Sequence, residues 1–128
     1  MMNATQTNLD QTLMALADPT RRAILQRLLE GEARITDLAQ PFEMSLNSVS
    51  KHIRILERAK LVRRRRDGRE HLLSFNPAPL DEAAAWIEAQ RAFWAARLNI
   101  LDALLQAEKE QDDNRQVAAS RRKKNRSR

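Results

Sequence analysis

The sequence predicts a mainly α-helical domain that carries one small β-hairpin before its last helix, in the order α-α-α-α-β-β-α. Apolar residues recur every three or four positions in several segments, which is the spacing of a helix with one buried face. One Asp-Gly pair stands between two runs suited to extended chain, and this arrangement is typical of a hairpin. The chain has 128 residues, which is room for one domain, and we place it at residues 8–106.

The composition excludes several kinds of site. There is no cysteine, so disulfides, thiolate metal sites and cysteine nucleophiles are excluded, and two glycines are too few for a phosphate-binding or dinucleotide-binding loop. No apolar run approaches the roughly 20 residues that cross a bilayer. The N-terminus lacks the basic start and apolar stretch of a secretory signal. We therefore expect a cytoplasmic protein with no membrane partner.

Positive charge gathers in two stretches of the chain. The net charge is +6, but residues 51–69 alone carry +7 and residues 121–128 carry +6, while the rest of the chain carries −7. A concentrated basic stretch is typical of a surface that binds nucleic acid. A basic face that is merely solvated is the alternative, and the charge count favours neither.

Two helices are expected before Gly31. Leucines recur at helical spacing over residues 8–17, which predicts a first helix after a flexible segment of residues 1–7. Asp18 then suits the N-cap of a second helix, and Pro19 suits its first position. Gly31 lies just past the end of the second helix, where a left-handed backbone is common. The apolar face of the second helix has four residues: Ile24, Leu25, Leu28 and Leu29.

A short third helix is expected over residues 36–40, and a turn that contains Pro41 joins it to a fourth helix. Ser45 caps the fourth helix, which runs to about Ala59. The apolar face of this fourth helix comprises Leu46, Val49, Ile53 and Leu56. The opposite face is polar and basic, with Asn47, Lys51, Arg54 and Arg58. Such a helix buries one flank and offers the other to a partner.

The hairpin is centred on Asp67 and Gly68, which we take as its two turn residues. The predicted cross-strand pairs are then Arg66 with Arg69, Arg65 with Glu70, and Val62 with Leu73. This register makes Arg65 and Glu70 an opposite-charge pair. It also places the apolar residues of the hairpin on one side, namely Val62, Leu73 and Phe75.

A long last helix is expected over residues 80–106. Two apolar stripes run along it and comprise Trp86, Ile87, Phe93, Trp94, Leu98, Ile100, Leu101 and Leu105. One small domain does not cover so broad an apolar face, which therefore indicates an interface. Residues 107–128 are charged, contain no aromatic residue and end in a basic run, so we expect a disordered tail.

The third and fourth helices form a helix-turn-helix candidate, and the hairpin after them has the form of a wing. In a helix-turn-helix the second helix enters the major groove of DNA with its N-terminal residues at the base edges. We therefore expect base contacts from Asn47, Ser48 and Lys51. Phosphate or mixed contacts are expected from Thr36, Ser45, Ser50, His52 and Arg54, and wing contacts from Arg65, Arg66 and Arg69.

Three segments, in order and with matching spacing, resemble the arsenic-repressor (ArsR/SmtB) family of winged-helix regulators. They are Leu16–Leu25, the fourth helix with its exit over Met44–Val62, and Asp67–Glu70 at the hairpin tip. The resemblance covers about Leu9 to Leu105. It implies a winged helix-turn-helix fold and a repressor that binds double-stranded DNA. It also implies a homodimer that forms through the first and last helices. The residues expected at that interface are Leu9, Leu13, Trp86, Phe93, Trp94, Leu98 and Leu101.

The chain departs from that family at two points. Lys60 stands where the family commonly has glycine, and a left-handed backbone there would cost about 1 kcal/mol. Metal-sensing members bind metal through cysteines in the third helix or through histidine and acidic residues in the last. This chain has no cysteine and no histidine in its last helix. We therefore expect no metal and no cofactor. The sequence does not identify an inducer, which would be a small molecule or a protein.

Two other functions stay open on the residues alone. One is a protein-interaction module that keeps this fold and docks a partner through its last helix. The other is a metal sensor with unfamiliar oxygen ligands. An enzyme is not expected, because Ser48 and His52 lie one helical turn apart with no acid or oxyanion-binding group to complete a nucleophilic site.

Overall fold

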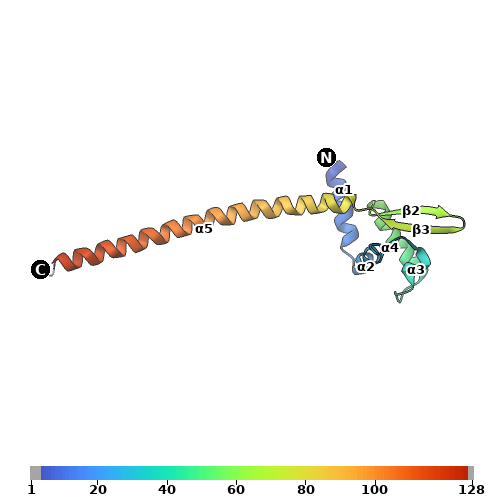
Figure 1. The fold of residues 1–128 in the computed structure, drawn as a ribbon, viewed down its shortest axis with the longest axis horizontal. Coiled ribbons are helices and arrows are strands. Elements are labelled where there is room, and N and C mark those ends of the chain that lie inside the picture. The colour runs from blue at the N-terminus through green and yellow to red at the C-terminus, as the bar shows by residue number, and fades with distance from the viewer. Residues whose placement is uncertain (1–3, 127–128) are drawn as a thin grey trace. The chain divides into compact units, whose positions relative to one another are not determined.

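The computed structural model describes residues 4–126, and it confirms a mainly helical chain with a small antiparallel sheet (Figure 1). The elements are α1 (Ala4–Leu16), α2 (Pro19–Leu28), β1 (Ala33–Arg34), α3 (Ile35–Ala39), α4 (Leu46–Arg58), β2 (Val62–Asp67), β3 (Glu70–Phe75) and α5 (Ala78–Arg126). The chain divides into two compact units after Trp86. Helix α5 begins in the first unit and continues through the second.

The junction between the first two helices is the one that the sequence predicts. Asp18 is the N-cap of α2, and its carboxylate accepts a hydrogen bond from the backbone amide of Arg21 at 3.1 Å, with Pro19 at the first helical position. Helix α1 begins earlier than predicted, at Ala4, because no glycine or proline interrupts the residues before position 8. Residues 4–7, which we expected to be flexible, are therefore helical, and residues 1–3 lie outside the described part of the chain.

The sheet has a third strand that the predicted order lacks. Strand β1 pairs antiparallel with β3, with Ala33 opposite Leu73 and Arg34 opposite Leu72, so the strand order is β1-β3-β2. A strand of two residues is too short to show an alternating pattern, which is why the sequence does not reveal it. Its pairing makes β3 the central strand and ties the base of the hairpin to the start of α3.

The hairpin is confirmed, but its register differs by two residues from the prediction. Asp67 pairs with Glu70, so the turn residues are Gly68 and Arg69 rather than Asp67 and Gly68. Gly68 has a φ of +63° and takes the first central position, where a type II′ turn requires a positive φ. The Asp-Gly pair indicated the hairpin correctly, but of its two residues only Gly68 lies in the turn, and Asp67 belongs to β2.

The two-residue shift leaves the faces of the hairpin unchanged, because side chains alternate with a period of two. Val62 and Leu73 are both buried and Phe75 is half-buried, on the side that the sequence predicts. The cross-strand partner of Arg65 is Leu72, so the predicted pair of Arg65 with Glu70 is wrong.

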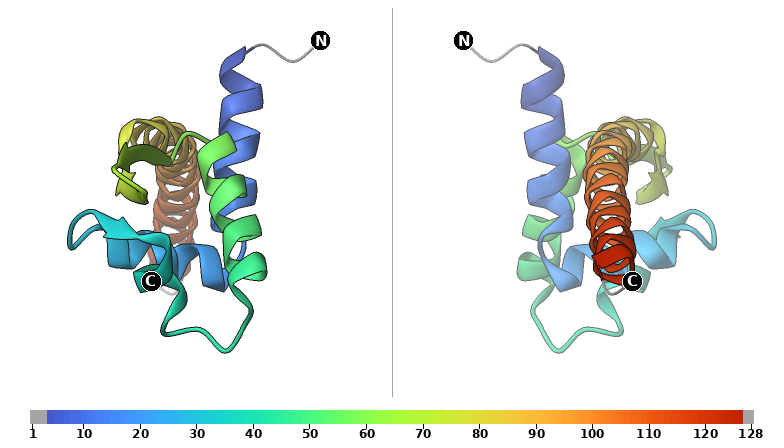
Figure 2. Two further views of the ribbon diagram at one scale, coloured as in Figure 1. Left: turned by 90° about the vertical axis from the view of Figure 1, so that its right-hand side faces the viewer. Right: turned by 90° about the vertical axis from the view of Figure 1, so that its left-hand side faces the viewer.

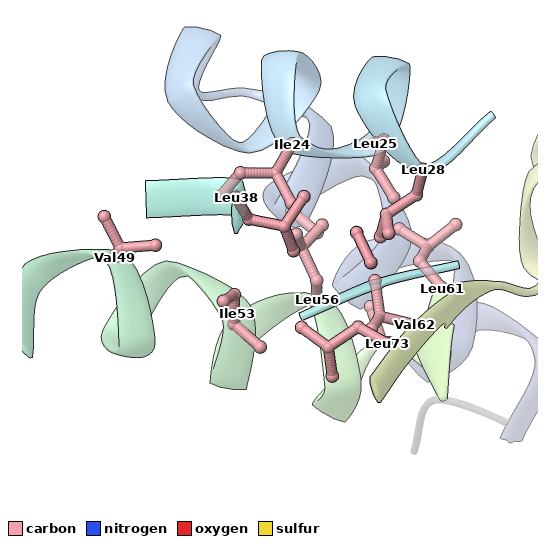
Figure 3. Packing of buried hydrophobic residues seen from close by; sticks show 13 residues of the cluster. Ile24, Leu25, Leu28, Leu38, Val49, Ile53, Leu56, Leu61, Val62 and Leu73 are labelled. Carbon is pink, nitrogen blue, oxygen red and sulfur yellow. The ribbon is translucent and has the colours of Figure 1, made fainter. Parts of the chain in front are cut away.

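The core of the first unit lies between α2, α4 and the sheet, and α1 runs beside α4 (Figure 2). Figure 3 shows Val49, Ile53 and Leu56 of α4 within a cluster that also includes Ile24, Leu25, Leu28, Leu38, Leu61 and Leu73. Leu46, predicted for the same buried face, is 50% exposed, so that part of the prediction is wrong. It is the first residue of α4 and stands one turn before the core begins.

Helix α4 ends in a Schellman motif at Lys60. The amide of Lys60 donates to the carbonyl of Glu57 at 2.9 Å, and the amide of Leu61 donates to the carbonyl of Leu56 at 3.0 Å. Lys60 has a φ of +61°, and the side-chain amide of Asn76 donates to its carbonyl at 2.7 Å. A lysine therefore occupies the left-handed position where glycine is usual. We expect this strained backbone to lower the stability of the fold relative to glycine.

Helix α5 is longer than predicted and reaches Arg126 instead of ending near residue 106. Residues 107–126 contain no glycine or proline and are rich in alanine, glutamine and charged residues, many of them good helix formers. The segment expected to be a disordered tail is thus helical up to Arg126, and residues 127–128 lie outside the described residues.

Candidate nucleic-acid interface

The helix-turn-helix consists of α3, α4 and the turn between them. Leu38 of α3 and Val49 of α4 are both buried in the common core, which fixes the two helices against each other. Ser45 caps α4 as predicted, since its hydroxyl accepts from the amide of Ser48 at 3.1 Å. The hydroxyls of Ser45 and Ser48 also lie 3.0 Å apart. They stand at the end of α4 that meets the base edges in a helix-turn-helix.

The two flanks of α4 are separated as the sequence predicts. Val49, Ile53 and Leu56 are fully buried. The opposite flank is exposed and carries Asn47, Lys51, Arg54 and Arg58, which we call the basic face of α4. Amide, ammonium and guanidinium groups are the side-chain groups that pair with base edges in the major groove and with phosphates. This face therefore has the chemistry and the freedom to bind a DNA duplex.

Two further hydroxyl residues belong to the helix-turn-helix. Thr36 is exposed in the first turn of α3, and Ser50 is half-buried on α4. Hydroxyls in such places can reach phosphate oxygens.

His52 is not part of the basic face. Its side chain is 23% exposed, and its Nδ1 atom lies 3.2 Å from Nη1 of Arg21 and 3.8 Å from Oδ2 of Asp18. The hydrogen bond from the backbone amide of Arg21 lowers the pKa of Asp18. The ring is thus held against the start of α2.

Two of the four consecutive arginines of the hairpin are paired with carboxylates. Arg64 bonds to Glu57 of α4, with 2.6 Å between Nη2 and Oε1. Arg65 makes two hydrogen bonds to the carboxylate of Glu32, at 2.6 and 2.8 Å. These bonds hold the pKa of Glu32 below its ordinary value. Arg64 and Arg65 therefore anchor the hairpin to the body of the first unit.

The wing-tip cations are Arg66 and Arg69. Within residues 4–126 neither makes an ion pair, and Arg66 uses only its Nε atom, which donates to the carbonyl of Gly68 at 3.2 Å. Both residues are exposed near the turn of a hairpin that extends away from the helices of the first unit (Figure 1). Of the three arginines expected in the wing, these two remain available for phosphate, while Arg65 is already paired.

Three residues that position the wing are absent from the sequence prediction. Glu57 and Glu32 hold Arg64 and Arg65, and Arg34 donates to Glu70 at 2.9 Å. Glu32 and Arg65 are 33 residues apart, and Arg34 and Glu70 are 36 apart. No local pattern links such distant partners, so the sequence offers no signal for them.

The side chains expected at a dimer interface are largely exposed. In the first unit Leu13 and Trp86 are exposed and Leu9 is half-buried. In the second unit four apolar residues of α5 are each more than half exposed, with Trp94 and Leu98 at 60%; they are Phe93, Trp94, Leu98 and Leu101. A row of large exposed apolar residues is unusual on a monomer and marks an interaction surface.

Residues 4–126 contain no group of three or more His, Asp or Glu side chains placed to hold a metal ion. In that same part of the chain, no helix combines the length and the apolar character that crossing a bilayer requires.

Comparison with known proteins connects this interface to a family. The family described as "Helix-turn-helix domain" matches residues 16–65. The HTH-type transcriptional regulator Rv2034 of Mycobacterium tuberculosis is 35% identical over 99 residues, which cover 77% of this chain and 90% of that protein. The transcriptional repressor SdpR of Bacillus subtilis is 33% identical over 79 residues, covering 62% of this chain and 88% of that protein. The crystal structure of an ArsR family transcriptional regulator matches with a TM-score of 0.68 and 38% identity, covering 74% of this chain and 97% of that one.

Three observations lead to one assignment. Helix α4 has a buried flank and a basic flank, the wing carries arginines without ion pairs in the described residues, and the relatives are helix-turn-helix transcriptional regulators. The chain belongs to the ArsR/SmtB family of helix-turn-helix, DNA-binding transcriptional regulators.

Proposed function

We propose that this chain is a cytoplasmic, homodimeric repressor that binds a near-palindromic DNA operator in a sequence-specific manner. The observation that carries the proposal is the basic face of α4, which is exposed while Val49, Ile53 and Leu56 on the opposite flank are fully buried. A helix fixed on one side and free on the other can enter a major groove without unfolding anything.

Base reading is assigned to the first turns of α4. The amide of Asn47 suits adenine, and the ammonium of Lys51 suits guanine, because these groups match the donors and acceptors on those base edges. Ser48 adds a hydroxyl that the cap with Ser45 already orients. Arg54, Ser50 and Thr36 are assigned to phosphates, which fix the register of the helix on the duplex.

The wing is assigned to the DNA backbone or the minor groove beside each half-site. Arg66 and Arg69 supply the positive charge, since neither is neutralised by a carboxylate in the described residues. The hydrogen bonds of Arg64 and Arg65 restrict the motion of the hairpin relative to the first unit, so the hairpin loses less conformational entropy when DNA binds.

The homodimer is supported by the exposed apolar residues of α1 and α5. Burying such residues removes apolar surface from water, which is the main favourable term in association. Two copies related by a two-fold axis would place two α4 helices on half-sites about one helical turn apart.

Selection of bound duplexes from a random DNA pool by the full chain tests this function. We expect enrichment of two inverted half-sites whose centres lie about 10 base pairs apart. Trp94→Glu should give a monomer in sedimentation and lose the enrichment of paired half-sites. No enrichment and no retardation of any duplex at low salt would contradict the proposal and favour α5 as a docking surface for another protein. Heat released at stoichiometric zinc in a calorimetric titration would instead favour a metal sensor.

A further inference from the structure

Arg21 connects three helices through one guanidinium group. It lies in the first turn of α2, and its Nε atom donates to the carbonyl of Ala15 at 2.8 Å. Its Nη2 atom donates to the carbonyl of Met14 at 3.0 Å. Its Nη1 atom lies 3.2 Å from Nδ1 of His52 in α4. The same group therefore satisfies two carbonyls at the end of α1 and contacts the helix that carries the basic face.

The contact with His52 requires one protonation state of the ring. A guanidinium is always charged and has donors but no acceptor. Nδ1 of His52 must therefore accept the hydrogen bond, which makes the ring neutral with its proton on Nε2. The charged groups that face the ring are Arg21 and Asp18, whose Oδ2 atom lies 3.8 Å from the same Nδ1. A protonated ring would lose the bond to Arg21 and turn towards Asp18.

The contact between Arg21 and His52 lies next to residues that we propose bind DNA. His52 follows Lys51 directly on α4, so the ring and the basic face share one turn of the same helix. On the other side of the guanidinium, α1 carries Leu13 of the proposed dimer interface. Arg22 is a matched neighbour, because it donates to the carbonyl of Leu16 at 2.7 Å and makes no hydrogen bond or ion pair with α4 in the described residues.

We propose that Arg21 is a positioning residue that holds α4 against the end of α1 through His52, so that operator affinity depends on His52 staying neutral. This inference rests on the proposed function. It adds a link between the dimerising and the DNA-reading helix, and it adds a response to acid.

The first arm of the test compares Arg21→Gln with Arg22→Gln in the full chain. Fluorescence anisotropy measures the affinity of each for the selected operator at about pH 7.5, and circular dichroism checks the fold. Arg21→Gln should weaken binding about tenfold, which is the scale of one lost charge-assisted hydrogen bond. Arg22→Gln should stay within about twofold, because it removes the same charge and a carbonyl contact but leaves His52 in place.

The second arm uses His52→Asn, whose side-chain carbonyl can accept near the position of Nδ1 and does not titrate. This variant should bind within about twofold of the unmodified chain at pH 7.5, and between pH 7.5 and 5.5 the unmodified chain should lose about three- to tenfold more affinity than the variant. Because both proteins keep His71, the difference between their profiles isolates His52.

Parallel pH profiles for the unmodified chain and His52→Asn would overturn the inference, as would equal affinities for Arg21→Gln and Arg22→Gln. If Arg21→Gln does not fold, the His52→Asn profile decides alone. Failure of the unmodified chain to bind the operator at pH 7.5 would contradict the proposed function itself, and so the two failures are distinguishable.

Discussion

Removing the two wing-tip cations should weaken binding to every duplex and flatten its dependence on salt. Arg66→Ala combined with Arg69→Ala takes away two arginines near the hairpin turn that have no ion pair in the described residues. The contacts of Arg64 and Arg65 stay in place, so the hairpin keeps its anchors. The perturbation therefore removes charge from the tip without removing the structure that presents it.

The size of the effect follows from the number of phosphate contacts. Each contact contributes about −0.9 to the slope of log K against log salt concentration. Two arginines in each of two subunits make four contacts in the proposed dimer, so the slope should flatten by about 3.6 if all four reach phosphate. If a single arginine of each wing reaches phosphate, the change should be about 1.8.

Fluorescence anisotropy over a series of salt concentrations, with the operator and with an unrelated duplex, measures both slopes. The control is Arg22→Ala combined with Arg27→Ala, which removes the same charge from exposed positions on α2. An unchanged slope in the wing variant would refute the reasoning. An equal change in the control would show that net charge, not the position of the wing tip, governs the affinity.

Three further changes test the local physics. Lys60→Gly should raise the free energy of unfolding by about 1 kcal/mol in urea titrations, and Lys60→Ala should not, because alanine shares the strain of a φ of +61°. Leu56→Ala should lower the free energy of unfolding by about 2–5 kcal/mol, because Leu56 is fully buried. Leu46→Ala should lower it by less than about 1 kcal/mol, because Leu46 is 50% exposed, and equal losses would contradict the packing of α4. Hydrogen bonds from Arg65 lower the pKa of Glu32 from 4.5, so the stability they add is present above that pH and lost as pH falls through the depressed value. Urea unfolding curves of the unmodified chain and Glu32→Gln should therefore differ at neutral pH and converge in acid, whereas a constant difference would contradict the pairing.

The helices were predictable because their information is local. The buried flank of α4 repeats at helical spacing, and Asp18 and Ser45 are capping residues whose hydrogen bonds the structure contains. The exception, Leu46, shows that spacing identifies a face but does not say where along the helix the core begins.

The remaining features depend on residues far apart in the chain or on small energy differences. The hairpin shifted by two residues without moving any side chain to the other face, so the apolar pattern could not distinguish the two registers. The pairing of Arg65 with Glu32 joins a wing strand to the turn before β1, across 33 residues. In the sequence nothing distinguishes one arginine of the run from the next. In the structure Arg64 and Arg65 are paired with carboxylates, whereas Arg66 makes no ion pair in the described residues.

The preference of an Asn47→Ala variant for the selected operator over an unrelated duplex tests the central claim most directly. Asn47 is exposed on the first turn of α4 and is assigned to a base edge, so its loss should affect the operator more than the unrelated duplex. The ratio of the two affinities should fall by about fivefold or more, since one base contact contributes about 1–3 kcal/mol of discrimination. A ratio equal to that of the unmodified chain would contradict the account of α4 as the helix that reads DNA.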